Sequence, residues 1–420
     1  MPNETLDWSE KAFWTVDDPV EVSTFLTEGH TLFDGSVTWP VLALREPALA
    51  SNIATMAAYV ERHGMLFAPH GKTSMIPQLF RRQLDAGAWG ITVATAQQAM
   101  VALRTGTPRV LIAHEVLDRS ALQALLATRD ELREHGSQVT VYCFVDSPEG
   151  VQLAGEAAAA SLGDTFPVLL DVGFMGGRTG VRSVEAAIEL ARQVRKIDSL
   201  ELVGAACYEG GLRESDDARG FLEFLREVTE AVLEHGLFDD GSPLVSAGGS
   251  AHFDLVASDL AGAWAQSHGV RVLLRSGAYV THDDLDYAER TPFRHLTGEG
   301  ELQPALELWA QVVSVPEDGL ALVGMGKREA PFDEGLPVPK LLRRAGSTEL
   351  IPISGGAVTA KLNDQHGYVH FATSDPDLAI RPGDLICFGI SHPCTAFDKW
   401  RWLPLLDDDD RIIDVMRTYF

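Results

Sequence analysis

Eight short apolar runs, separated by amphipathic helical stretches, constrain the fold of this chain more than any other feature. The runs lie at 65–69, 88–93, 109–112, 139–145, 167–172, 201–207, 244–247 and 271–275. A helical pattern such as 221–235 ends at Gly236, which suits a left-handed helix cap. Apolar strands that alternate with helices indicate a parallel sheet covered on its outer face. Eight such units predict an α/β fold, a (β/α)8 TIM-type barrel, rather than an open doubly wound sheet.

The chain changes character after residue 300. The apolar strands predicted there are 305–315, 320–326, 367–371 and 384–390. The first two are separated by Pro-Glu-Asp-Gly at 316–319, which predicts a hairpin. We expect a second, mostly β domain, joined by the lone strand at 40–45. The expected division is a barrel over 38–300 and a β domain built from 1–37 plus 301–420.

Charge and composition limit the classes of function. Lys and Arg number 34 against 60 Asp and Glu, a net charge of -26, which opposes binding to nucleic acid or anionic lipid. No apolar run reaches the roughly 18 residues of a membrane span, and the first residues lack a secretory signal pattern. Four scattered cysteines are too few for a disulfide framework. These features predict a cytoplasmic protein that acts on a small molecule. The acidic run 407–410 is expected to be a solvated loop rather than a metal site.

The loops after the barrel strands carry the candidate chemistry, because function in this fold sits at the carboxyl ends of the strands. The loops 246–250 and 276–279 are glycine-rich and follow the seventh and eighth strands. Backbone N–H groups in such loops can cradle a phosphate, although tight turns would also explain the glycines. Lys72 follows the first strand, where a desolvated lysine can form a Schiff base with a carbonyl. A solvated lysine or a phosphate partner is the alternative. The combination suggests pyridoxal phosphate.

Six motifs together resemble one known family. They are PHGKT (69–73), DVGFMGGRTGV (171–181), YEGG (208–211), SAGGS (246–250), LRSGAY (274–279) and SHPCTAFDKW (391–400). In this order they resemble the fold-type III pyridoxal-phosphate enzymes of the D-serine dehydratase and D-threonine aldolase family, which shares its barrel with alanine racemase. The resemblance runs from about residue 38 to the C-terminus. It implies a homodimer, in which the β domain of one subunit covers the barrel of the other, and a D-amino acid substrate.

The resemblance also implies a role for each matching residue. Lys72 would hold the cofactor and exchange protons at the substrate α-carbon. Arg178 would lie near the cofactor's phenolic oxygen and Tyr208 beside its pyridine ring. The phosphate-binding loops would include Gly248, Gly249, Gly277 and Tyr279. His392 and Cys394 would bind a divalent metal near the β-hydroxyl of the substrate.

The proposed metal site also has a chemical basis. Hydroxide leaves poorly unless its oxygen is polarised, and a bound cation does this as a Lewis acid. Imidazole and thiolate suit Zn²⁺, with Mn²⁺ or Mg²⁺ as further candidates. Two protein ligands make a weak site, so a buried thiol at Cys394 with a hydrogen-bonding His392 is the alternative. The His-x-Cys pattern resembles the family's dehydratases, whereas its aldolases resemble His-x-Asp.

We therefore expect a dehydratase that converts a D-serine- or D-threonine-type substrate to a 2-oxo acid and ammonia. Three alternatives remain open at this point. One is retro-aldol cleavage to glycine and an aldehyde, and another is a non-catalytic pyridoxal-phosphate-binding protein. The third is a racemase, which would need a second base, for which Tyr279 and Tyr368 are available.

Overall fold

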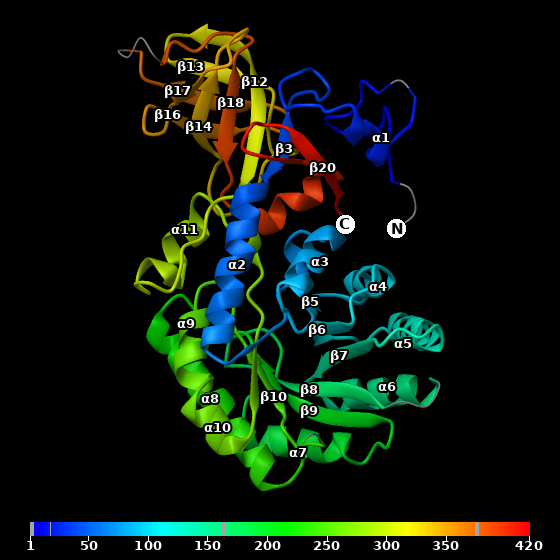
Figure 1. Ribbon diagram of the computed structural model, residues 1–420. Coiled ribbons are helices and arrows are strands. Elements are labelled where there is room, and N and C mark those ends of the chain that lie inside the picture. The colour runs from blue at the N-terminus through cyan, green and yellow to red at the C-terminus, as the bar shows by residue number, and fades with distance from the viewer. Residues whose placement is uncertain (1–3, 17, 162–164, 240, 374–377) are drawn as a thin grey trace.

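The computed structural model describes residues 4–16, 18–161, 165–239, 241–373 and 378–420. Figure 1 shows two lobes, a barrel below and a β domain above, with the long helix α2 running between them. Among the described residues the barrel has eight parallel strands. They are β4 (Leu66–Phe67), β5 (Ile91–Val93), β6 (Arg109–Glu115), β7 (Thr140–Val145), β8 (Phe166–Val172), β9 (Leu200–Cys207), β10 (Leu244–Ala247) and β11 (Arg271–Leu274). Each overlaps one predicted apolar run, so the prediction of the barrel is confirmed.

The sheet runs in the order β4-β11-β10-β9-β8-β7-β6-β5 and then closes on itself. A parallel bridge between His70 and Thr92 joins its two ends. The N–H of Trp89 also donates to the carbonyl of Phe67 at 2.6 Å across the same gap. The carboxyl ends of all these strands therefore meet at one mouth, which is where a barrel carries its chemistry.

Helices cover the outside of the barrel. The helices of the described chain are α1 (Val22–Thr27), α2 (Glu46–Arg62), α3 (Pro77–Asp85), α4 (Ala96–Arg104), α5 (Arg119–Glu134), α6 (Pro148–Ala159), α7 (Val184–Val194), α8 (Ser215–Glu234), α9 (Phe253–Leu255), α10 (Ala263–His268) and α11 (Asp286–Arg290). Asp118, Ser147 and Ser183 each accept a backbone N–H and so begin α5, α6 and α7. Gly236 follows α8 with φ +62°, as the sequence predicts. No helix in the described part of the chain is long and apolar enough to span a membrane.

The second domain is a mostly antiparallel sheet with the order β15-β14-β18-β12-β13-β17-β16. Its strands are β12 (Leu306–Glu317), β13 (Leu320–Val323), β14 (Val338–Arg343), β15 (Leu350–Pro352), β16 (Ala357–Leu362), β17 (Gly367–Phe371), β18 (Leu385–Gly389), β19 (Trp402–Leu406) and β20 (Ile412–Arg417). The predicted hairpin is confirmed as β12 and β13. A further pair, β1 (Thr5–Leu6) and β2 (Val20–Glu21), lies near the N-terminus.

Both ends of the chain contribute to this domain. The strand β3 (Val41–Arg45) pairs antiparallel with β12 and parallel with β19. The expectation that this early strand joins the β domain is confirmed, so the sheet pairing of β3 places it outside the barrel although it lies within 38–300. After β18 the chain turns back toward the barrel through 391–399, which includes the short 3-10 helices Pro393–Thr395 and Phe397–Lys399. This return segment brings the predicted metal motif to the mouth of the barrel.

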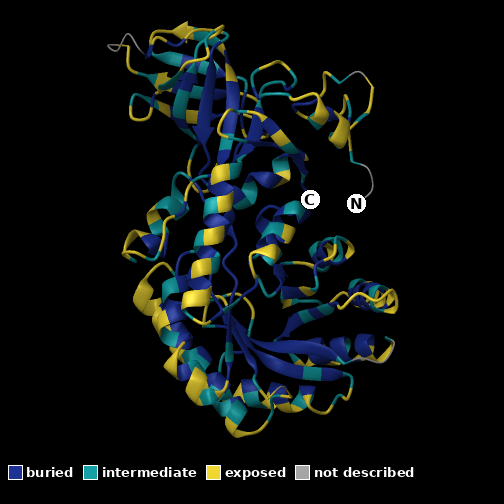
Figure 2. Cartoon of the chain, viewed as in Figure 1, coloured by how far each residue is buried: buried dark blue, intermediate teal, exposed yellow. Residues whose placement is uncertain are grey.

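Figure 2 shows the strands of the barrel mostly buried (dark blue) and the outer faces of its helices exposed (yellow). The inside of the barrel is filled by its own apolar cluster, whose buried members are Ala68, Leu111, Phe144, Leu169, Val203, Ala206, Leu244 and Leu273. This cluster separates the two ends of the barrel. The mouth at the carboxyl ends of the strands is therefore closed from the opposite end by packed side chains.

Candidate active site

Lys72 lies in a one-turn 3-10 helix, Gly71–Thr73, directly after β4. The loop after β11 passes close behind it: a Cβ on Gly277 would lie 2.4 Å from the carbonyl oxygen of His70, so only glycine fits there. Burial lowers the pKa of the Lys72 ammonium, and the nearby Arg178 and Arg275 lower it further, although Cys394 opposes them. The lowered pKa makes it easier for Lys72 to lose its proton, which a lysine must do before it forms a Schiff base with a carbonyl.

Two arginines share the mouth of the barrel with Lys72. Arg275, at the end of β11, is 4% exposed and donates to Ser246 Oγ at 2.7 Å and to the carbonyl of Cys207 at 2.5 Å. Arg178 lies over the ring of Tyr208, with its guanidinium carbon 4.3 Å from the ring centroid. Among the described residues no carboxylate lies within 4 Å of Lys72, Arg178 or Arg275 in an ion pair. Three cations without acidic partners make a site for an anionic ligand.

The glycines of the loop after β10 donate hydrogen bonds to a carboxylate of the protein. Gly248 has φ +104°, a conformation open to glycine, and its N–H donates to Glu209 at 3.0 Å. The N–H of Gly249 donates to the other oxygen of Glu209 at 2.7 Å. Glu209 is completely buried, so its carboxylate ties the loop after β9 to the loop after β10. In this structure these two predicted phosphate donors bind a side chain of the protein.

Other backbone donors remain for a phosphate. Within the described residues, the N–H groups of Ser250 and Gly277 donate to no partner. Tyr279 lies two residues after Gly277: its side chain is buried and packs on Phe67 at 5.4 Å between ring centroids, and its hydroxyl accepts from Gln83 at 2.8 Å. A structural role accounts for these contacts of Tyr279.

His392 and Cys394 reach the Lys72 turn of their own chain. Cys394 Sγ lies 3.3 Å from Thr73 Oγ1, one residue from Lys72. His392 Nδ1 lies 2.7 Å from Asp333 Oδ2, whose second oxygen accepts from the Thr395 hydroxyl at 2.8 Å. Contact with Cys394, followed by Asp333, raises the pKa of His392 to about 9. The predicted metal motif therefore reaches the barrel from the β domain of the same chain. The family resemblance implies that the β domain of a partner subunit also covers this barrel.

The short helix α11 places a further residue, Tyr287, near the candidate site. Tyr287 is not among the predicted site residues. Asp283 accepts the N–H groups of Leu285, Tyr287 and Ala288 and so fixes the start of α11. Tyr287 is mostly buried, and its pKa is raised first by burial and then by the charges of Cys394 and Tyr208. Tyr287 and Tyr208 both therefore lie near Cys394.

The residues present fit both groups that the sequence predicts. The half-buried lysine, the unpaired cations and the free N–H groups suit an aldehyde that carries a phosphate. An imidazole fixed by a carboxylate on its far nitrogen, next to a thiol, is the arrangement of a metal-binding histidine. No cluster of three or more His, Cys, Asp and Glu side chains suited to a metal occurs in the described ranges. Two protein ligands therefore leave positions open for substrate or water.

A barrel with a half-buried lysine and a phosphate-type cradle at its mouth defines a fold-type III pyridoxal-phosphate enzyme. Residues 45–265 match the family model of the "Alanine racemase, N-terminal domain", and residues 305–406 match the "Putative serine dehydratase domain". The chain belongs to this alanine racemase-like family, in the branch of the D-serine dehydratases and D-threonine aldolases.

Similar proteins include both aldolases and a dehydratase. A 3-hydroxy-D-aspartate aldolase of Paracoccus denitrificans is 27% identical over 72% of this chain and 76% of its own length. A D-threo-3-hydroxyaspartate dehydratase of Delftia sp. is 27% identical over 81% of this chain and 86% of its own. The structure of D-threonine aldolase from Filomicrobium marinum superposes with a TM-score of 0.76 and 25% identity, covering 93% of this chain and 97% of that one.

Proposed function

We propose that this protein is a pyridoxal-phosphate- and divalent-metal-dependent lyase that acts on D-3-hydroxy amino acids, most simply as a dehydratase. The observation that carries the proposal is the distance of 3.3 Å between Cys394 Sγ and Thr73 Oγ1. It places a thiol next to the turn that carries Lys72, and His392 contacts that thiol. The relatives named above act on D-3-hydroxy amino acids by dehydration or aldol cleavage, which agrees with this class of reaction.

Each residue of the site has a defined task. When bound, pyridoxal phosphate supplies an electron sink for negative charge at the substrate α-carbon. Burial lowers the pKa of Lys72, which favours its Nζ as the base that accepts the α-proton. The Ser250 and Gly277 N–H groups would hold the phosphate, and Arg178 and Tyr208 would line the open side. Gly248 and Gly249 support these loops through Glu209.

His392 and Cys394, the two proposed metal ligands, would act at the β-carbon of the substrate. A divalent cation supplies Lewis-acid polarisation of a hydroxyl oxygen. His392 would present its second ring nitrogen to the cation, because Asp333 accepts from Nδ1, and Cys394 would provide its sulfur. Imidazole and thiolate favour Zn²⁺ over Mn²⁺ and Mg²⁺. Elimination releases one water, hydrolysis of the product consumes one, and the net reaction converts the amino acid to a 2-oxo acid and ammonia.

Aldol cleavage is the second candidate, since curated relatives with this activity are as similar in sequence as the dehydratase. The test is a product assay with purified protein, pyridoxal phosphate, Zn²⁺ and D-threonine. We expect 2-oxobutanoate and ammonia. Glycine with acetaldehyde would instead establish the aldolase. If D-threonine, D-serine and D-3-hydroxyaspartate yield neither a 2-oxo acid nor glycine, the proposed lyase activity is refuted.

We also propose that the protein works as a homodimer in the cytoplasm. The family resemblance supports the dimer, and light scattering of the purified protein tests it. All four cysteines are free, and three of them are buried, which agrees with a reducing compartment.

A further inference from the structure

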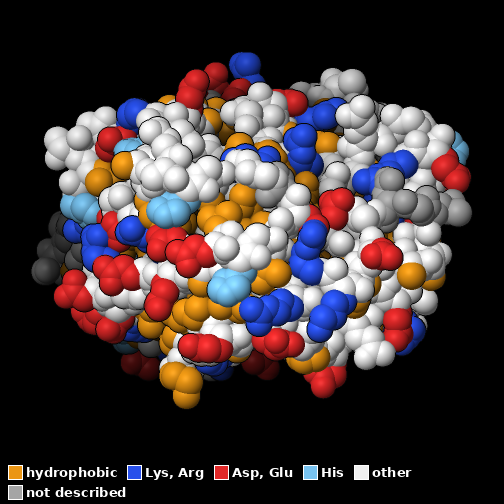
Figure 3. Space-filling view, turned by 90° about the horizontal axis from the view of Figure 1, so that it is seen from below, with side chains coloured by type: hydrophobic (Ala, Val, Ile, Leu, Met, Phe, Trp, Pro, Cys, Tyr) orange, Lys and Arg blue, Asp and Glu red, His pale blue; other side chains and the backbone are white. Residues whose placement is uncertain are grey.

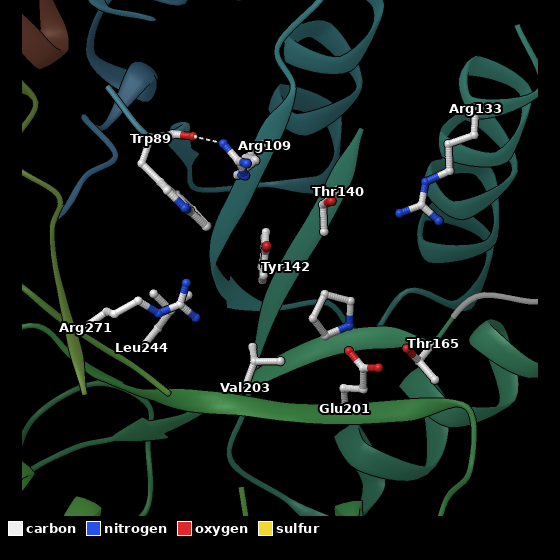
Figure 4. Close-up of a pocket in the computed structure, with 11 residues that line it drawn as sticks. Trp89, Arg109, Arg133, Thr140, Tyr142, Thr165, Glu201, Val203, Leu244 and Arg271 are labelled. Atoms are coloured by element: carbon white, nitrogen blue, oxygen red, sulfur yellow. Dashed lines mark hydrogen bonds between the residues drawn. The ribbon is translucent and has the colours of Figure 1, made fainter. Parts of the chain in front are cut away.

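The two halves of the candidate site are held in different ways. Lys72 directly follows a strand of the closed barrel, whose strands are all paired with their neighbours. Figure 4 shows this sheet at the barrel end opposite Lys72, where Arg109 of β6 also donates to the backbone carbonyl of Trp89 at 3.2 Å. The predicted metal motif, His392 and Cys394, lies instead on a loop of the β domain. That loop depends on contacts other than strand pairing to keep its position.

Lys11 supplies such contacts from the N-terminal segment, which lies beside the β domain in Figure 1. Its ammonium donates to the backbone carbonyl of Lys399 at 3.0 Å and to that of Arg328 at 3.1 Å. Lys399 ends the return segment that carries the metal motif, and Arg328 belongs to the loop 324–337 that carries Asp333. One side chain therefore joins the two loops on which the metal motif and its carboxylate partner lie.

A buried carboxylate and a buried aromatic ring complete this contact. Glu329 is 4% exposed, and its Oε1 lies 3.7 Å from Lys11 Nζ. Its Oε2 accepts the N–H of Gly326 at 2.9 Å, and its backbone carbonyl accepts the indole N–H of Trp400 at 2.9 Å. Lys11 Nζ also lies 4.6 Å from the centre of the Trp400 ring. Loop 324–337 and the end of the return segment are thus bonded to each other around the Lys11 ammonium.

The setting of Lys11 differs from that of an ordinary surface cation. Figure 3 shows basic side chains beside acidic ones on the outer surface, and exposed pairs of this kind contribute little to stability. The partners of Lys11 are instead backbone carbonyls and groups buried from solvent. Its own segment is anchored as well, because Glu10 accepts from Arg401 at 2.8 Å and Phe13 is completely buried. Lys11 is therefore fixed by its segment and can in turn fix the two loops.

We infer that Lys11 is a positioning residue for the candidate site. It holds loop 324–337 against the return segment and so keeps the metal motif at the Lys72 turn with Asp333 behind it. Lys11 acts through these two loops rather than on a reacting atom. The expected consequence, tighter binding of a divalent cation by the metal motif, rests on the proposed function, whereas the contact between the loops does not.

Hydrogen exchange measured by mass spectrometry tests the contact, in protein saturated with pyridoxal phosphate and freed of metal by a chelator. Lys11→Met keeps a long unbranched side chain but removes the ammonium. We expect amides in 324–337 and 391–401 to exchange roughly tenfold faster, the effect of losing one or two charge-assisted hydrogen bonds, and those of β6 to exchange as before. Lys11→Arg keeps a positive charge with several donors, so it should restore slow exchange.

Two results of this measurement would overturn the inference. Unchanged exchange in both loops would show that Lys11 does not hold them. An equal rise throughout the β domain, including β16 and β17, would show that Lys11 only stabilises the domain as a whole.

The Zn²⁺ affinity, measured by competition with a chromogenic chelator, tests the consequence for the metal motif. Removal of a positive charge would by itself favour the binding of a cation. A positioning role predicts the opposite sign: Lys11→Met should bind Zn²⁺ roughly tenfold more weakly, as after the loss of an outer partner of a metal ligand. The control is Lys361→Met on β16, which removes a lysine that also lies over an aromatic ring, 5.2 Å from the centre of Tyr368. It should leave both exchange and affinity unchanged.

Zn²⁺ binding by Lys11→Met that is as tight as in the wild type, or tighter, would overturn the positioning role. Absence of Zn²⁺ binding by the wild type would instead refute the metal dependence proposed above. Hydrogen exchange in the two loops would then decide the inference about Lys11 by itself.

Discussion

Asp333 Oδ2 lies 2.7 Å from His392 Nδ1, so one carboxylate sets the orientation of the histidine that faces Cys394. The two residues are 59 positions apart and belong to different loops of the β domain. Thr395 donates to the other oxygen of Asp333, which keeps the carboxylate in place. A carboxylate in this position fixes which ring nitrogen is available to a metal and increases its basicity.

Replacing this carboxylate should weaken metal binding. We expect Asp333→Asn to lower the Zn²⁺ affinity by roughly 10- to 100-fold, the usual effect of losing such a partner. Competition with a chromogenic chelator measures this affinity. Glu334→Gln, at the exposed neighbouring position, is the matched control and should leave it unchanged. Equal affinities for Asp333→Asn and the wild type would show that Asp333 does not support a metal ligand.

Lys72→Ala should abolish covalent attachment of the cofactor. Borohydride reduction of the wild-type protein with pyridoxal phosphate is expected to add the reduced cofactor to the peptide containing Lys72, and mass spectrometry identifies it. Lys327→Ala, in the loop after β13, is the control and should retain the label. A label on another lysine in the Lys72→Ala protein would show that a different residue holds the cofactor.

Glu209→Ala should destabilise the protein because it leaves the buried N–H groups of Gly248 and Gly249 without acceptors. Unsatisfied buried donors cost about 1–3 kcal/mol each, so a loss of roughly 2–6 kcal/mol in unfolding free energy is expected. Glu209→Gln keeps one acceptor oxygen and should lose less. Urea unfolding measures both variants, and a Glu209→Ala protein as stable as wild type would contradict a structural role.

Asp283 should give the protein a pH-dependent stability. Burial raises the pKa of its carboxyl to about 6, although the N–H groups of Tyr287, Ala288 and Leu285 lower it. Between the ordinary value, 3.8, and about 6 the folded state holds a proton that the unfolded state has lost. Its contribution is therefore greatest below about pH 4 and falls as the pH rises to about 6.

The variant Asp283→Asn tests this slope. Its Oδ1 can accept the same three N–H groups without ionising. Relative to the variant, the wild type should lose up to about 3 kcal/mol of unfolding free energy between pH 4 and pH 7. Urea unfolding at several pH values measures the difference. Parallel stability curves for the two proteins would contradict the raised pKa.

Much of this architecture follows from local sequence. The barrel strands appear as apolar runs because they are buried on both faces, and Gly236 and Lys72 mark positions next to regular elements. Arg275 carries a sequence signal as well, since it is the only charged residue that stands last in any of the eight predicted runs. Arg275 is nevertheless not among the predicted site residues.

The remaining parts depend on contacts between distant loops. Nothing around Asp333 indicates a partner for His392, because the pairing arises from the path of the β domain and not from a local period. Glu209 lies beside Tyr208 in a predicted motif, yet its contact with Gly248 requires knowledge of how two adjacent barrel loops fold over each other. Tyr279 shows the reverse case: its motif suggests a cofactor contact, whereas its hydroxyl binds Gln83.

The pairing of β3 with β19 has a consequence for how the protein is made on the ribosome. The barrel strands lie between residues 66 and 274, so they are synthesised and can associate first. His392, Cys394 and β19 (Trp402–Leu406) emerge only at the end of translation, when β19 can pair with β3, made some 360 residues earlier. A nascent or truncated chain thus contains Lys72 but lacks His392 and Cys394. The complete candidate site forms only when the segment after β18 has been synthesised.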